Sequence, residues 1–233
     1  MPSPFARLHA LAAQLGRWNA VLYLLSRALE AGTRGKARIV KYYIVAQPIR
    51  SSAPTRSDAS TSVQMVSRGD PLTSSFPRPT EVIARRYSNG AQCLAAVVRE
   101  AFAGYLWWQH ERYEEDEVRC TYVLLDKESC VWDYDVYVEP RFRLGRTLSR
   151  LWQRANDELC GRGVRWTFSR ISAFNPASLA SHARLGMQAR QSATFWVLGP
   201  LQISCMNMPP YLHVSLSDRQ RPTLKLSAPA DSS

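Results

Sequence analysis

The chain has 233 residues, 45% of them hydrophobic, so it is long and apolar enough to bury one substantial core. Thirty Lys and Arg against nineteen Asp and Glu give a net charge of +11, which predicts an anionic ligand or partner, or else reflects an arginine-rich composition alone. Five scattered cysteines exclude a disulfide framework and a structural zinc site. With no long apolar run and no signal-peptide pattern, we expect a cytoplasmic protein without a metal site.

Residues 1–35 are predicted to form an amphipathic N-terminal helix. Apolar residues recur three or four positions apart over residues 5–31, and Gly32 and Gly35 follow. One interpretation is a helix that packs on the rest of the domain. The alternatives are a helix at a membrane surface, because Trp18, Tyr23 and the nearby arginines are typical of one, or a helix in a partner's groove.

After residue 35, predicted ordered segments alternate with segments whose composition predicts irregular structure. Residues 36–50 predict a first strand, residues 51–75 a flexible loop rich in Ser, Thr and Pro, and residues 209–233 a polar tail. Between them, residues 76–208 form the predicted core. It is expected to contain strands over 91–98 and 101–109, a hairpin of 118–125 with 131–138, and final strands over 193–198 and 201–206.

Residues 131–187 carry the most informative pattern. Strand 131–138 leads through the basic turn 139–146 into a helix over 147–159, and strand 165–172 leads into a second helix that starts at Asn175. A glycine-bearing, basic turn at a helix N-terminus is a common way to bind phosphate. The alternative is an ordinary strand-to-helix turn with solvated arginines.

Two stretches of this region resemble the GNAT superfamily, the GCN5-related N-acetyltransferases. Residues 138–148 are similar to its strand, Pro, Arg-rich turn and helix, and residues 175–187 share its Asn, small residue and Leu-Gly. Three departures are that His182 replaces a Tyr, that Met187 replaces a Phe, and that Gly145 is the turn's single glycine, which shifts the phosphate register by about two residues. The resemblance implies an α/β (mixed α+β) fold, with a twisted mixed sheet of about six or seven strands flanked by helices.

The resemblance also implies acetyl-CoA as co-substrate. Its phosphates would meet the backbone amides of the turn and the side chains of its arginines, and its pantetheine arm would pair with the backbone of the preceding strand. Asn175 would either bind the pantetheine or only cap its helix. The predicted cofactor-binding residues are Val136, Val138, Arg141, Arg143, Leu144, Gly145, Arg146, Thr147 and Asn175.

Transfer of an acyl group needs a base for the amine and an acid for the leaving thiolate. His182 stands where the family has its acid, the alternative being a packing histidine. Asp133 and Asp135 alternate on one strand, so they are predicted to share a face and to include the base. The alternative is that they form salt bridges with Arg170 or Arg119.

The predicted function is transfer of an acetyl or other short acyl group from acyl-CoA to an amine, by direct attack in a ternary complex. One alternative is a non-catalytic GNAT-like module that docks a membrane or protein partner through residues 5–31, and another is an acyltransferase that uses acyl-carrier protein. The acidic run 114–117 either attracts a cationic acceptor or is a solvated loop. No nucleic-acid-binding signature is present, so no nucleic-acid partner is expected.

Overall fold

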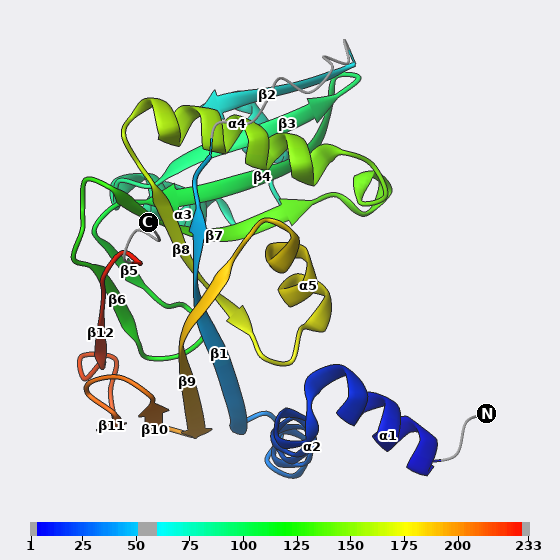
Figure 1. Cartoon of the computed structure of the whole chain (residues 1–233), viewed down its shortest axis with the longest axis vertical. Helices are drawn as coiled ribbons and strands as arrows, with labels where there is room; N and C mark the ends of the chain where they lie inside the picture. The colour runs from blue at the N-terminus through cyan, green and yellow to red at the C-terminus, as the bar shows by residue number, and fades with distance from the viewer. Residues whose placement is uncertain (1–3, 51–59, 230–233) are drawn as a thin grey trace. The chain divides into compact units, whose positions relative to one another are not determined.

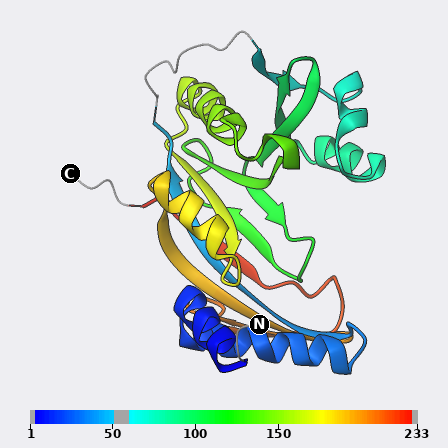
Figure 2. The ribbon, with the colours of Figure 1, turned by 90° about the vertical axis from the view of Figure 1, so that its right-hand side faces the viewer.

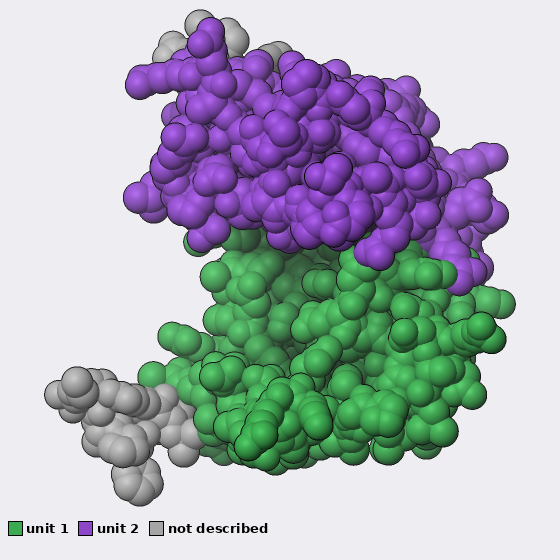
Figure 3. All heavy atoms as spheres, turned by 180° about the vertical axis from the view of Figure 1, so that it is seen from behind, with its two compact units in different colours: residues 1–47, 113–123, 169–231 green, residues 48–112, 124–168, 232–233 purple. Residues whose placement is uncertain are grey.

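A computed structural model describes residues 4–50 and 60–229. The chain divides into two compact units, coloured green and purple in Figure 3. The described part of unit 1 comprises residues 4–47, 113–123 and 169–229, and that of unit 2 comprises residues 48–50, 60–112 and 124–168. Each unit is therefore assembled from separate stretches of chain.

The N-terminal segment of unit 1 is helical, but in two pieces. Helix α1 (Pro4–Leu15) and helix α2 (Arg17–Gly32) meet at Gly16, whose φ of 79° lies in the left-handed region that glycine adopts without strain. The expectation of one continuous helix is therefore wrong at Gly16. Helix α2 ends at Gly32, and the amide of Gly35 bonds the carbonyl of Glu30.

The strands of unit 1 form two groups (Figure 1). The first has the order β11-β10-β9-β1 with antiparallel neighbours, and the second has the order β12-β6-β5. Their bounds are β1 Ala37–Pro48, β5 Arg112–Glu114, β6 Thr121–Leu124, β9 Gln188–Leu198, β10 Leu201–Met206, β11 Leu212–Ser215 and β12 Thr223–Leu226. Helix α5 (Pro176–Arg184) precedes β9.

Unit 2 has the strand order β8-β7-β4-β3-β2, in which only the β7–β8 pair is parallel. The bounds are β2 Thr61–Val66, β3 Gln92–Val98, β4 Ala101–Gln109, β7 Cys130–Val138 and β8 Trp166–Ser172, the last of which continues into unit 1. Helix α4 (Thr147–Gly161) packs on β2, β3 and β4, and helix α3 (Thr80–Ser88) covers the opposite face (Figure 2). The core between α3 and the strands is aromatic and includes Phe76, Tyr105 and Trp107.

The mixed α/β class with helices on a mixed sheet is confirmed. Among the described residues, the larger sheet has nine strands instead of the expected six or seven. Three segment predictions are wrong. Residues 61–66 of the predicted loop form β2, whereas residues 51–59 lie outside the described part. The predicted hairpin of 118–125 with 131–138 does not form, because β6 pairs within β12-β6-β5 while β7 pairs with β4 and β8. The predicted polar tail contains β11 and β12, with Leu224 and Leu226 buried.

Candidate cofactor site

The ladder between β7 and β8 is short. It joins Cys130–Trp132 to Trp166–Phe168 and then stops, whereas β7 continues to Val138 beside β4. Val136 and Val138 lie on this continuing stretch, as predicted for the strand that would meet the pantetheine arm. The carbonyl of Val138 accepts a hydrogen bond of 3.0 Å from Arg143 Nε, so this side chain ties the strand's end to the turn that follows.

A β-bulge interrupts β7 at Asp135. Tyr105 of β4 pairs with Tyr137 and Trp107 pairs with Tyr134, so β7 has one residue more than β4 over this interval, and Asp135 has a φ of 48°. The extra residue breaks the alternation of side chains. The prediction that Asp133 and Asp135 share one face is therefore wrong.

The carboxylate of Asp135 is held by three donors. Arg78 donates to both of its oxygens at 2.9 and 2.5 Å, Arg86 donates at 2.6 Å and the Tyr105 hydroxyl donates at 3.0 Å. Burial by itself raises the pKa of Asp135, but the charge of Arg86 and the hydrogen bonds from both arginines outweigh it and leave the pKa below its ordinary value. The salt-bridge alternative thus describes Asp135, with Arg78 and Arg86 as partners in place of Arg170 or Arg119.

Asp133 is buried on the opposite face of β7. It pairs in register with Trp108, and its Oδ2 accepts a hydrogen bond of 2.6 Å from Thr167 Oγ1 on β8. This bond joins the two strands next to the end of their ladder.

The turn after β7 combines a short 3₁₀ helix, Pro140–Phe142, with the N-terminus of α4. The Gly145 amide donates to the Phe142 carbonyl at 3.1 Å, so it is already used within the turn. Arg146 is the N-cap residue and its side chain makes no capping bond. The amides of Arg146 and Thr147 have no acceptor within the described residues, which leaves the positive end of the helix dipole available to an anion.

A cavity of about 520 Å³ opens beside this turn, entirely within unit 2. The α4 side is lined by four predicted residues, Arg141, Gly145, Arg146 and Thr147, together with Phe142 and Arg150. A Cβ on Gly145 would lie 3.3 Å from the Phe142 carbonyl oxygen, so a side chain there would crowd the backbone of the turn. Of the other predicted turn residues, Leu144 is fully exposed and Arg143 bonds the Val138 carbonyl, and neither lines the cavity.

The opposite wall comes from residues that were not predicted. Arg99 belongs to the turn between β3 and β4, and Ser60 and Thr61 open β2. The Arg99 amide donates to the Ser60 carbonyl at 2.8 Å, which holds the β3–β4 turn against the residue before β2 within this wall. Arg150 could have been predicted from the sequence, because it lies four residues after Arg146 and therefore on the same helix face. Arg99 could not have been predicted, because its position depends on the pairing of β2 with β3.

The remaining predicted site residues belong to unit 1. Asn175 caps α5, since its side chain accepts the Ser178 amide at 3.0 Å, which is the capping interpretation. Nδ1 of His182 lies 3.3 Å from Gln47 Oε1, and burial lowers the pKa of this histidine. Within the acidic run 114–117, Glu115 is buried and not solvated. Its carboxylate accepts hydrogen bonds from Arg170 at 2.7 and 2.8 Å. Among the described residues, no three His, Cys, Asp or Glu side chains gather as a metal site.

Comparison with solved structures finds similar folds at low sequence identity. A Novosphingobium aromaticivorans protein from the GNAT family aligns at 15% identity and a TM-score of 0.48, over 67% of this chain and 63% of its own. A tandem GNAT protein from the clavulanic acid biosynthesis pathway aligns at 17% and 0.49, over 78% and 58%. A Salmonella typhimurium protein with its cofactor acetyl-CoA aligns at 17% and 0.42, over 57% and 82%. The aligned part thus spans less than two thirds of the first two structures.

These alignments have TM-scores of 0.42 to 0.49, so the similarity to the solved structures extends only to part of the fold. No family model matches the sequence, and no curated protein matches it. The case for a ligand site in this chain therefore depends on its own geometry, that is, on the short β7–β8 ladder, the bulge at Asp135 and the arginine-lined cavity.

Proposed function

We propose that the protein is an acyl-CoA-dependent acyltransferase that moves an acetyl or other short acyl group to an amine. The observation that supports this most is the cavity at the N-terminus of α4, which is lined by Arg99, Arg141, Arg146 and Arg150. CoA carries a diphosphate and a 3′-phosphate, and guanidinium groups bind phosphate oxygens through paired, charge-assisted hydrogen bonds. A volume of about 520 Å³ lies within the range of small-molecule sites.

The amides of Arg146 and Thr147 would hold the diphosphate, because the first amides of a helix lack partners and carry a partial positive charge. The side chain of Arg143 takes another role, since its bond to the Val138 carbonyl holds the end of β7 against the turn. Val136 and Val138 would then align the pantetheine arm through their backbone.

In the reaction, the amine nitrogen attacks the thioester carbonyl carbon, the new C–N bond forms and the C–S bond breaks. The amine loses a proton and the CoA thiolate gains one. Direct attack is favoured over an acyl-cysteine, because burial raises the pKa of the Cys120 thiol to about 12 and also raises that of Cys130. Thiolate formation at either residue is therefore unfavourable near neutral pH.

His182 is the proposed proton-transfer residue. We assign it the role of accepting the proton from the amine, in place of the acid role that the resemblance implies. Its lowered pKa keeps the imidazole neutral near pH 7. If Nδ1–H donates to Gln47 Oε1, the imidazole takes the tautomer in which Nε2 carries the lone pair. Asp133 is the proposed positioning residue, because its carboxylate holds Thr167 at the end of the β7–β8 ladder, whereas the oxygens of Asp135 are already occupied by donors.

Thermal unfolding with acetyl-CoA tests the cofactor. A ligand at a hundred times its Kd adds about 2.7 kcal/mol, which should raise Tm by about 5–10 °C in a chain of this size. Gly145→Glu puts charge and bulk into the cavity and should abolish the shift. Gly161→Glu, at the open far end of α4, should retain it. A wild-type Tm that neither acetyl-CoA nor longer acyl-CoAs move would favour the non-catalytic module.

The pH dependence of acyl transfer tests His182. The rate kcat/KM should rise as His182 loses its proton, with a midpoint below the ordinary value of 6.5. His182→Phe should remove this acidic limb and lower the rate by about 10²–10⁴-fold. If the variant keeps the wild-type rate and pH profile, His182 has no part in proton transfer.

A further inference from the structure

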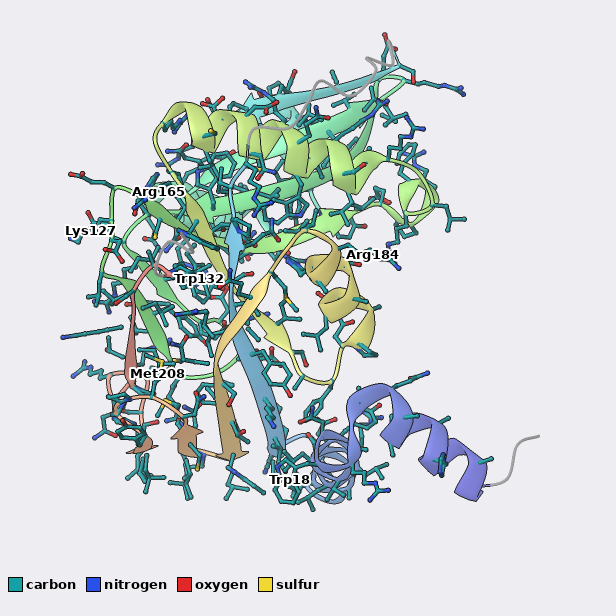
Figure 4. All side chains as sticks on the ribbon, in the orientation of Figure 1. Trp18, Lys127, Trp132, Arg165, Arg184 and Met208 are labelled. Atoms are coloured by element: carbon teal, nitrogen blue, oxygen red, sulfur yellow. The ribbon has the colours of Figure 1, made fainter. Side chains whose placement is uncertain are left out.

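Helix α2 carries an exposed apolar stripe, defined here as Trp18, Val21, Leu24 and Leu25. Their spacing places them on one side of the helix, and Trp18, labelled in Figure 4, is 69% exposed. The other side of α2 faces the strands of unit 1. There, Ser26 exchanges hydrogen bonds with the Ile39 backbone at 2.9 and 3.1 Å, so the packing of α2 on β1 leaves the stripe uncovered.

A second apolar surface lies on the same side of unit 1. Side chains of paired strand residues share a face, and the register links Ile39 to Trp196, Trp196 to Ile203 and Ile203 to Val214. Helix α2 covers this face at β1, but at its outer strands Leu212 and Val214 are exposed. Helix α2 and the outer strands β10 and β11 lie at the same end of unit 1 in Figures 1 and 2.

The net charge around the stripe is positive. No Asp or Glu precedes Glu30 in the sequence. Arg17 lies before the stripe, and Arg34 and Lys36 follow α2, all three exposed. Arg27 is paired with Glu30 at 3.0 Å, so it adds no net charge. A Trp-bearing apolar stripe between exposed cations matches a lipid interface, where Trp sits at headgroup depth and cations meet anionic headgroups.

We propose that unit 1 binds the surface of an anionic lipid bilayer through the α2 stripe, with the helix lying in the plane of the interface. No helix in the described part of the chain is long and apolar enough to cross a bilayer. Apolar burial of the stripe supplies one part of the affinity and electrostatic attraction the other, so binding depends on anionic lipid and weakens with salt.

Co-sedimentation of the full chain with vesicles tests the proposal. Wild type should sediment with phosphatidylcholine–phosphatidylglycerol vesicles and much less with phosphatidylcholine alone. Trp18→Ser/Leu25→Ser should lower partitioning at least about tenfold, and Arg17→Gln/Lys36→Gln should lower it about fivefold per charge. Leu125→Ser, a similarly exposed residue of unit 2, is the matched control and should sediment as wild type does.

Two further measurements separate the outcomes. The emission of Trp18, taken as the difference between wild type and Trp18→Phe, should shift to shorter wavelength on anionic vesicles. Melting curves should show that every variant folds, because the substituted side chains are exposed. Failure of wild type to sediment, or equal sedimentation of the stripe variant, overturns the proposal. A dimer in sedimentation velocity that the stripe variant dissolves, without vesicle binding, would assign the stripe to a second copy of the chain instead.

Discussion

The carboxylate of Asp135 holds together a part of β7 whose backbone is unfavourable for most residues. Its φ of 48° lies in the left-handed region, which Asp tolerates better than bulky residues do. Two guanidinium groups and the Tyr105 hydroxyl converge on it, and Arg86 also stacks over Trp107 and Tyr134 at 5.3 and 5.2 Å. The charge therefore fixes the bulge, which lies close to the end of β7 at Val138 and so to the turn that follows.

Asp135→Asn removes the charge but keeps a residue that accepts a positive φ. It leaves Arg86, which is mostly buried, without its counter-ion, so we expect a loss of about 2–4 kcal/mol in the free energy of unfolding. Lys127→Ala breaks an exposed pair with Glu111 and should change stability by less than about 0.5 kcal/mol. Urea denaturation measures both. Equal midpoints for the two variants would show that the Asp135 cluster does not stabilise the fold.

The same residue predicts an acid dependence. The pKa of Asp135 is lower in the folded chain than its ordinary value of 3.8, so its stabilisation is complete above that value. It is lost as the pH falls through the lower, folded pKa, because protonation then removes the salt bridges. The stability of wild type should therefore decline more steeply below pH 4 than that of Asp135→Asn, as measured by denaturant midpoints across this range.

At the scale of elements, the sequence predicts those helices and strands that are determined by residues close together in the chain. The run from β7 through α4, β8 and α5 follows from hydrophobic period, turn chemistry and an Asn cap, and the structure has all four elements. Strand β2 could not be predicted, because it is short and polar on its exposed face and gains its partner only through the ladder with β3. The false hairpin has the same origin, since strand partners are chosen by contacts distant in sequence.

The candidate site divides in the same way. Arg141, Gly145, Arg146 and Thr147 were predicted to bind the cofactor, and all four line the cavity because one continuous turn contains them. Arg99 reaches the cavity only through tertiary pairing. The two aspartates were assigned by strict alternation, which a single inserted residue at the bulge reverses.

The approach of β4 to the end of β7 depends on Gly104. A Cβ there would lie 2.4 Å from the Tyr137 carbonyl oxygen and 3.2 Å from the Val138 Cα, both backbone atoms. Gly104→Ala should therefore separate the strands, cost about 2–3 kcal/mol and also weaken the stabilisation by acetyl-CoA. Gly161→Ala, which meets no atom within 4 Å, should be neutral or slightly stabilising. If Gly104→Ala unfolds at the same urea concentration as wild type, the approach of β4 to the end of β7 does not depend on Gly104.

At the scale of the whole molecule, the core of unit 1 needs three separate parts of the chain. The beginning supplies β1, the middle supplies β5 and β6, and the end supplies β9 to β12. The amide of Thr121 in β6 bonds the carbonyl of Pro222, directly before β12, at 2.9 Å. Strand β12 therefore completes a sheet whose other two strands, β5 and β6, lie about a hundred positions earlier.

Substitution in β12 tests this dependence. Leu224 is fully buried, and its neighbour Lys225 is exposed. Leu224→Ala leaves a cavity and should lower the free energy of unfolding by about 2–5 kcal/mol. Lys225→Ala removes a surface side chain and should change it by less than about 0.5 kcal/mol. Hydrogen exchange should also show faster exchange of the β6 amides in Leu224→Ala, because β6 and β12 belong to one sheet. If both variants unfold at the wild-type midpoint, the C-terminal segment behaves as the polar tail that its composition predicts, and unit 1 folds without it.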